Sequence, residues 1–77
     1  MWIRSQDGKI LCKCEEVYLG NHYDYYKIEN DKWVLGEYST EKKAIKVLDM
    51  IEKWINNFSC SSIVSIPVFQ MPKNDEV

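Results

Sequence analysis

The chain has 77 residues, of which 45% are hydrophobic and 29% charged, and its formal net charge is −2. This composition is typical of one globular domain and excludes the low hydrophobicity and high net charge of a disordered chain. Lysines and acidic residues are interspersed, so no basic field exists to follow a nucleic-acid backbone, and we expect no binding to nucleic acid. No apolar run approaches the roughly 18 residues of a membrane span, and the start lacks a signal-peptide pattern. We therefore expect a cytoplasmic protein with no membrane partner.

The small size of the chain and its cysteines limit the possible oligomeric state, disulfides and metal sites. A core of this size rarely supplies more than roughly 3–5 kcal/mol, so we expect the chain to form a homo-oligomer. Its three cysteines, Cys12, Cys14 and Cys60, are an odd number, which argues against a disulfide framework and favours reduced, buried thiols. Zinc sites pair C-x2-C spacings or add histidines, whereas this chain has one C-x-C, a lone Cys60 and a lone His22. We expect no metal and no cofactor.

The first half of the chain has the pattern of an antiparallel β-meander of four to five strands. Residues 2–6 and 9–14 alternate as strands, and the Asp7-Gly8 pair between them is typical of a two-residue hairpin. In the second of these strands the two thiols share one face with Ile10, a face we expect to lie under the helix. Further strands are predicted at 17–19, 23–29 and 32–38, with turns at Gly20-Asn21 and Asn30-Asp31.

One amphipathic helix follows the meander. Apolar residues recur at helical spacing, at Ala44, Val47, Leu48, Ile51, Ile55 and Phe58. Ser39 or Thr40 supplies the N-cap oxygen, and Asn56-Asn57 marks the end. This helix is expected to pack one face on the sheet, which makes the fold class α+β.

The C-terminal part is predicted to add one more strand. Residues 63–71 are β-branched and apolar, but Pro67 lacks the N–H donor that a central strand needs, so this is expected to be an edge strand. The first strand is expected to be the other edge. We place a single α+β domain at 1–72 and a flexible acidic tail at 73–77.

No constellation of catalytic residues is evident in the sequence. Nucleophilic catalysis needs a base beside a serine or cysteine, and the single histidine, His22, falls in a predicted solvated turn. Glu15 and Glu16 are adjacent and point to opposite faces of a strand, so they do not converge on one bond. The three glycines are far apart, so there is no glycine-rich phosphate loop. We expect a non-enzymatic protein.

Aromatic, basic and amide side chains at the two chain ends are the candidate ligand-binding residues. Trp2, Arg4 and Gln6 alternate onto one face, where an aromatic plane, a guanidinium and an amide suit stacking, phosphate pairing and polar recognition. The full predicted set is Trp2, Arg4, Ser5, Gln6, Phe69 and Gln70. The competing interpretation is that Trp2 covers the sheet edge while Arg4 makes a surface ion pair.

The tyrosine-rich hairpin offers an alternative, a protein interface. Its candidate residues are Tyr23, Tyr25 and Trp33, because tyrosine and tryptophan are enriched among interface residues that contribute most to binding. Under that hypothesis the protein is an inhibitor or adaptor that acts on a host protein.

Three segments carry a resemblance to a known family. They are Met-Trp-Ile-Arg-Ser-Gln-Asp at 1–7, Leu-Gly-Glu-Tyr-Ser-Thr leading into Lys-Ala-Ile-Lys-Val-Leu-Asp-Met-Ile across 35–51, and Val-Phe-Gln-Met-Pro at 68–72. In these the chain resembles a family of short, largely uncharacterised proteins of low-GC Gram-positive bacteria and their phages. Residues 20–26 depart from the family. The resemblance implies a phage or prophage setting, in which small proteins commonly inhibit host defence by occupying a protein surface or by sequestering a nucleotide immune signal, the latter as a sponge with its cleft between subunits.

Overall fold

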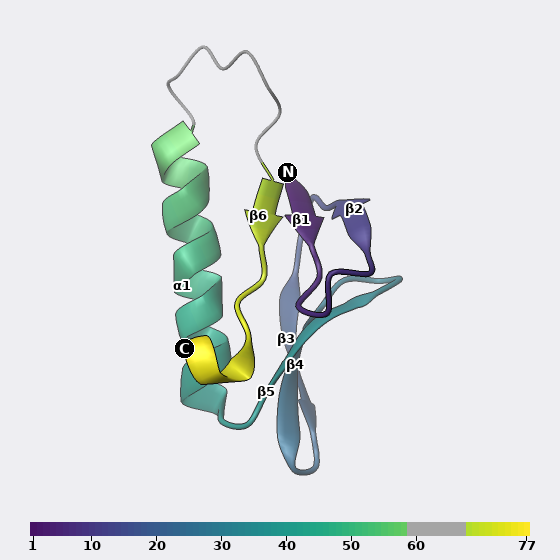
Figure 1. The fold of residues 1–77 in the computed structure, drawn as a ribbon. Helices are drawn as coiled ribbons and strands as arrows, with labels where there is room; N and C mark the ends of the chain where they lie inside the picture. Colours follow the sequence, from purple (N-terminus) through teal and green to yellow (C-terminus); the bar gives the residue numbers. More distant parts are fainter. Residues whose placement is uncertain (59–67) are drawn as a thin grey trace.

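The computed structural model describes residues 1–58 and 68–77, which form two small sheets and one long helix (Figure 1). Sheet A has the strand order β2-β1-β6 and sheet B the order β3-β4-β5. The elements are β1 (Trp2–Arg4), β2 (Leu11–Lys13), β3 (Tyr18–His22), β4 (Tyr25–Glu29), β5 (Val34–Tyr38), α1 (Glu41–Phe58), β6 (Val68–Gln70) and the 3-10 turn η1 (Asn74–Glu76). The predicted α+β class, a β-meander packed against one helix, is confirmed.

Sheet A joins the two ends of the chain. β1 pairs antiparallel with β2 and parallel with β6, so that Ile3 lies between Cys12 and Phe69. The prediction that the first strand is an edge is therefore wrong, because the C-terminal strand supplies its second partner. β6 is an edge strand, as predicted, while residues 63–67 of the predicted strand lie outside the described residues.

The turn between β1 and β2 is wider than the predicted two-residue hairpin. The backbone N–H of Ser5 donates to Ile10 O at 2.8 Å, and Gly8 has a positive φ of 76°. The Ser5 hydroxyl donates to the Asp7 carboxylate at 2.6 Å and accepts from the Ile10 N–H at 3.0 Å. These side-chain bonds fix a six-residue loop, which the Asp-Gly signal does not reveal.

Sheet B is the meander, but its first turn is not where the sequence placed it. Gly20 lies inside β3 opposite Lys27, and the chain turns at Tyr23 and the residue after it. A Cβ on Gly20 would meet the Glu29 carboxylate, so the end of that side chain would have to move. Tyr23 adopts the left-handed φ of 42° that the turn requires. The prediction of a turn at Gly20-Asn21 is therefore wrong.

The second turn of sheet B is confirmed at Asn30-Asp31. The Asn30 carboxamide oxygen accepts the backbone N–H groups of Lys32 and Trp33 at 2.9 and 2.8 Å, which is the local bonding that favours asparagine in turns. Just before the turn, a β-bulge between β4 and β5 adds one residue to β5.

Helix α1 packs on the sheets through only part of its predicted apolar stripe. Its first turn is capped by Thr40 Oγ1, which accepts the N–H of Lys43 at 3.2 Å. Ala44, Val47 and Ile51 are buried, whereas Ile55 is 49% exposed and lies at the margin of the predicted stripe. The whole core is one cluster that draws on both sheets and the helix, formed by Ile3, Cys14, Ile28, Leu35, Tyr38, Ala44, Val47, Ile51, Phe69 and Met71.

Residues 73–77 differ from the predicted flexible tail. Asn74–Glu76 form η1, and Asn74 Oδ1 accepts the N–H of Ser39 at 2.9 Å. Lys43 of α1 donates to the Asn74 carbonyl at 3.0 Å. The C-terminal turn thus lies against the start of the helix (Figure 1). Across residues 1–58 and 68–77, no helix has both the length and the apolar character needed to cross a bilayer.

Candidate functional site

The outer face of sheet A is the candidate binding surface. Side chains alternate along each strand, so the pairing register places Ile3 and Phe69 toward the core and their strand neighbours outward. The outward positions are Trp2, Arg4, Leu11, Lys13, Val68 and Gln70, which we call the outer face of sheet A. The predicted residues Trp2, Arg4 and Gln70 are thereby brought together from the two ends of the chain.

Two cations and one aromatic ring are neighbours on this face. Lys13 lies directly opposite Trp2, and Arg4 is two residues along β1, diagonal to Lys13. Diagonal neighbours of this kind are about 7–8 Å apart at the backbone, within reach of long side chains. Within the part of the chain that the structure describes, neither Arg4 nor Lys13 pairs with a carboxylate. The predicted alternative, a surface ion pair at Arg4, is therefore not formed among these residues.

The hydrogen bonds that Arg4 and Gln70 make within the protein determine which of their side-chain donors remain for a ligand. Arg4 Nε donates to the Gly8 carbonyl at 3.1 Å, which fixes the guanidinium while its terminal Nη groups stay available. Gln70 Nε2 donates to the carbonyls of Ser5 and Met71 at 3.0 and 3.1 Å. Arg4 is therefore the stronger candidate contact, and Gln70 mainly ties β6 to the β1–β2 loop.

Gln6 has a structural role rather than the predicted ligand contact. Its side-chain amide donates to Glu37 O at 3.1 Å and accepts the Glu37 N–H at 3.0 Å, as a neighbouring strand would. The same Nε2 also donates to Pro72 O at 3.2 Å, and the Gln6 N–H donates to Leu35 O at 2.7 Å. Gln6 thus joins β5 to sheet A and to the C-terminal segment.

Ser5 and Phe69 are also removed from the predicted site. Ser5 is 2% exposed and its hydroxyl is engaged within the β1–β2 loop. Phe69 is buried and meets Trp54 of α1 edge to face, with ring centroids 5.6 Å apart and an interplanar angle of 76°. The parallel pairing of β6 turns Phe69 inward, and the β1–β2 loop holds Ser5, so neither side chain is exposed on the predicted face.

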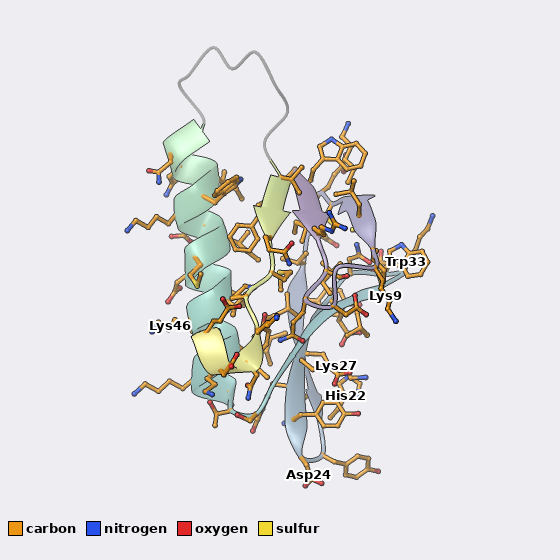
Figure 2. The ribbon with its side chains drawn as sticks, viewed as in Figure 1. Lys9, His22, Asp24, Lys27, Trp33 and Lys46 are labelled. Carbon is orange, nitrogen blue, oxygen red and sulfur yellow. The ribbon has the colours of Figure 1, made fainter. Side chains whose placement is uncertain are left out.

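The alternative interface residues are exposed but divided between two ends of sheet B. Tyr23 is fully exposed at the β3–β4 turn, next to Asp24, which Figure 2 shows at the tip of that hairpin. Trp33 is 46% exposed at the β4–β5 turn, at the opposite end of β4. The five residues of β4 span about 17 Å, so Trp33 does not form one patch with Tyr23 and Tyr25.

The outer face of sheet B carries a polar cluster that the sequence did not indicate. His22, predicted in a solvated turn, is half-buried at the end of β3, with Nε2 3.2 Å from Glu29 Oε2. Its ring stacks on Tyr25 at 6.3 Å, and Lys27 Nζ lies 5.2 Å from the centroid of the Tyr25 ring. Lys27 also approaches Glu37 at 4.0 Å. Lys27 thus has a carboxylate nearby, unlike the cations of the outer face of sheet A.

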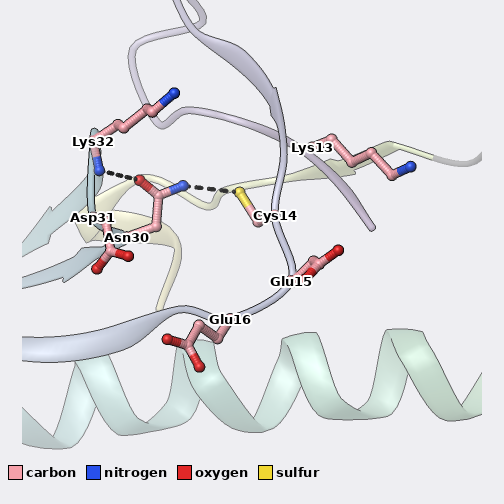
Figure 3. Close-up of a pocket in the computed structure, with 7 residues that line it drawn as sticks. All are labelled: Lys13, Cys14, Glu15, Glu16, Asn30, Asp31 and Lys32. Carbon is pink, nitrogen blue, oxygen red and sulfur yellow. Dashed lines mark hydrogen bonds between the residues drawn. The ribbon is translucent and has the colours of Figure 1, made fainter.

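An open pocket of about 470 Å³ lies beside β2, between the β2–β3 connection and the β4–β5 turn. Figure 3 shows its lining residues, which are Lys13, Cys14, Glu15, Glu16, Asn30, Asp31 and Lys32. Asn30 Nδ2 donates to Cys14 Sγ across the pocket wall at 3.2 Å. Five of the seven lining residues are charged. The described residues contain no cluster of three or more side chains able to hold a metal ion.

Lys13, Leu11 and Val68 are the site residues that sequence reasoning missed. The alternation of residues 11–13 was visible in the sequence, and a correct β1–β2 register would have placed Lys13 opposite Trp2. Val68 required the parallel β1–β6 pair, for which a single sequence carries no local signal.

Comparison with known proteins adds no assignment to this geometry. No protein-family model, no curated protein and no solved structure matches the chain.

Proposed function

We propose that this protein is a non-enzymatic binding protein that sequesters an anionic, nucleotide-type signal. The observation that carries the proposal is the outer face of sheet A, where Trp2, Arg4 and Lys13 are neighbours and neither cation has a carboxylate partner in residues 1–58 and 68–77. A base stacks on an indole ring, and phosphate oxygens pair with a guanidinium and an ammonium group. The sequence resemblance supports a phage or prophage setting, in which such a protein would act against host defence in the host cytoplasm.

We further propose that the ligand is held between subunits of a homo-oligomer. The outer face of sheet A is a three-stranded surface that contacts a ligand from one side, and a second chain would supply the opposite wall. Edge strand β3 has five residues and no second strand partner among the described residues, and it is available for pairing with another copy.

Binding of nucleotides by purified protein tests the proposal. A cyclic dinucleotide and a cyclic ADP-ribose are titrated by calorimetry, and each ligand is recovered after denaturation to show that it is intact. Arg4→Ala and Lys13→Ala are each expected to weaken binding about tenfold or more, because a hydrogen bond to a charged group contributes about 1.5–3 kcal/mol. Lys46→Ala is the matched control, since Lys46 is exposed on α1 away from the sheets (Figure 2).

Two results would contradict the proposal. The first is that neither nucleotide binds, and the second is that binding is unchanged in both Arg4→Ala and Lys13→Ala. Recovery of a hydrolysed product would instead indicate an enzyme. Native mass spectrometry of the ligand-bound protein measures the number of subunits, and a monomer would refute the part of the proposal that places the ligand between chains.

A second candidate function, binding to a host protein, is favoured by Tyr23. A bulky residue at positive φ is costly, and such strain is concentrated at functional sites. Tyr23 is fully exposed and gains nothing from the core. Under this hypothesis Tyr23→Asn abolishes binding to a purified host target while the fold is retained, and Arg4→Ala has no effect on it.

A further inference from the structure

The two thiols of the C-x-C segment lie against each other. Cys12 Sγ and Cys14 Sγ are 2.9 Å apart, which exceeds the length of a disulfide bond by only about 0.9 Å. Both are free thiols in the structure. Asn30 Nδ2 approaches both sulfurs, at 3.2 Å for Cys14 and 3.9 Å for Cys12. Packing from the β4–β5 turn thus holds the two sulfur atoms at a separation that a small rotation would close.

The backbone between these thiols sets how stable their disulfide would be. Cys12 lies in β2 and Cys14 is the first residue after it. Residues two apart in extended backbone are separated by about 6.4–6.8 Å at Cα, the upper end of the range that a disulfide spans. Bonding the two sulfurs therefore shortens the strand locally and strains the link. Strained disulfides are reduced more readily than relaxed ones.

Access to the pair is provided by the open pocket beside β2. Cys14 lines this pocket, which has a volume of about 470 Å³ and is shown in Figure 3. Cys14 itself is 6% exposed and Cys12 is half-buried, so a small reagent has to enter along this wall. Because most of the lining residues are charged, an uncharged reagent suits the pocket best.

We propose that Cys12 and Cys14 are a reversible dithiol–disulfide pair, oxidised by a low-molecular-weight disulfide. One cysteine, as its thiolate, attacks a sulfur of the small disulfide, forms a mixed disulfide and releases the first small thiolate. The second cysteine thiolate then attacks the protein sulfur of the mixed disulfide and releases the second small thiolate. The two protons lost by the cysteines are taken up by the two leaving thiolates. The net reaction converts two cysteine thiols and one small disulfide into one cystine and two small thiols.

Oxidation would reach the candidate binding face through Lys13. Lys13 stands between the two cysteines and points to the opposite side of β2, where it lies beside Trp2. Shortening the strand from Cys12 to Cys14 changes the position of Lys13 relative to Trp2. The redox step itself does not depend on the proposed function, and its test needs no nucleotide.

Thiol counting in a Cys60→Ser background tests the pair. The folded protein is incubated with 2-hydroxyethyl disulfide, which carries no charge, at about pH 9, because burial raises the pKa of Cys12 to about 11 and only the thiolate reacts. The intact mass is expected to fall by two hydrogen atoms, and both thiols are expected to become unreactive toward a maleimide added under denaturing conditions. Dithiothreitol is expected to restore both thiols.

Single-thiol variants provide the matched control. Cys12→Ser and Cys14→Ser, each in the Cys60→Ser background, are expected to stop at the mercaptoethanol adduct, because no second thiol is available. The proposal is overturned if the two-thiol protein accumulates the same adduct. It is also overturned if both thiols persist in the folded protein under conditions that oxidise the same chain in urea. Either outcome is read from the two-thiol protein itself, so a variant that fails to fold leaves the test intact.

Discussion

Replacing Gln6 measures how far one side-chain amide holds the two sheets together. The Gln6 amide makes three hydrogen bonds, two with the backbone of Glu37 and one with Pro72 O. At about 1 kcal/mol for each, Gln6→Ala removes about 3 kcal/mol of the free energy of unfolding. That is most of the roughly 3–5 kcal/mol expected of a domain this small.

The Gln6→Glu variant separates hydrogen bonding from side-chain size. A carboxylate can still accept the Glu37 N–H, but it has no N–H to donate and brings negative charge toward the Glu37 and Pro72 carbonyls. We therefore expect it to be at least as destabilising as Gln6→Ala at pH 7. The matched control is Asn57→Ala, which removes an exposed amide from α1.

Thermal unfolding followed by circular dichroism reports both changes. For a domain of this length a loss of 1 kcal/mol lowers Tm by about 4–8 °C, so Gln6→Ala is expected to lower it by about 12–24 °C. A Tm within about 3 °C of the parent protein for both variants, a loss below about 0.5 kcal/mol, would refute this reasoning. Gln6 would then return to the set of possible ligand contacts.

Three further predictions concern the core, the hairpin tip and pH. Phe69→Ala is expected to cost about 3–5 kcal/mol in urea unfolding, whereas Val68→Ala, next to it on the exposed face, should change stability by less than about 1 kcal/mol; equal losses would contradict the assigned register. Tyr23→Asn is expected to raise stability by about 1 kcal/mol, since asparagine tolerates positive φ, and an unchanged or lower urea midpoint would contradict the strain. Burial raises the pKa of Tyr38 above its ordinary value and that of Cys12 to about 11. The folded state therefore keeps these protons longer than the unfolded state, and the stability they contribute is complete below about pH 8 and is lost as pH rises from about 9 through 11 and above. Urea unfolding should show this loss, with a smaller one in Tyr38→Phe; stability independent of pH in that range would contradict it.

The helix could be predicted because its signals are local. The spacing of Ala44, Val47 and Ile51 and the oxygen of Thr40 each act within a few residues, and each has the predicted role. Hairpin turns were less certain, because glycine also occurs inside strands. Gly20 looked like a turn residue but lies inside β3, while the strained turn falls on Tyr23.

The candidate site was only partly predictable because its assignment depends on long-range pairing. Alternation correctly placed Trp2 and Arg4 on one side of β1, but it did not reveal what covers the other side. The parallel contact with β6 turns Phe69 inward, and the loop after β1 engages Ser5. Gln6 lost its predicted role for the same reason, since its partners are 31 and 66 residues away.

The parallel pairing of β1 with β6 also constrains the order in which the chain can fold. Sheet B and α1 use neighbouring segments, so their contacts form early and at low entropic cost. β1 waits for a partner that lies about 66 residues later in the chain, because Trp2 pairs with Val68. During translation β1 therefore has one open edge until β6 has left the ribosome. The outer face of sheet A, and any binding that depends on it, is completed only when β6 joins the sheet.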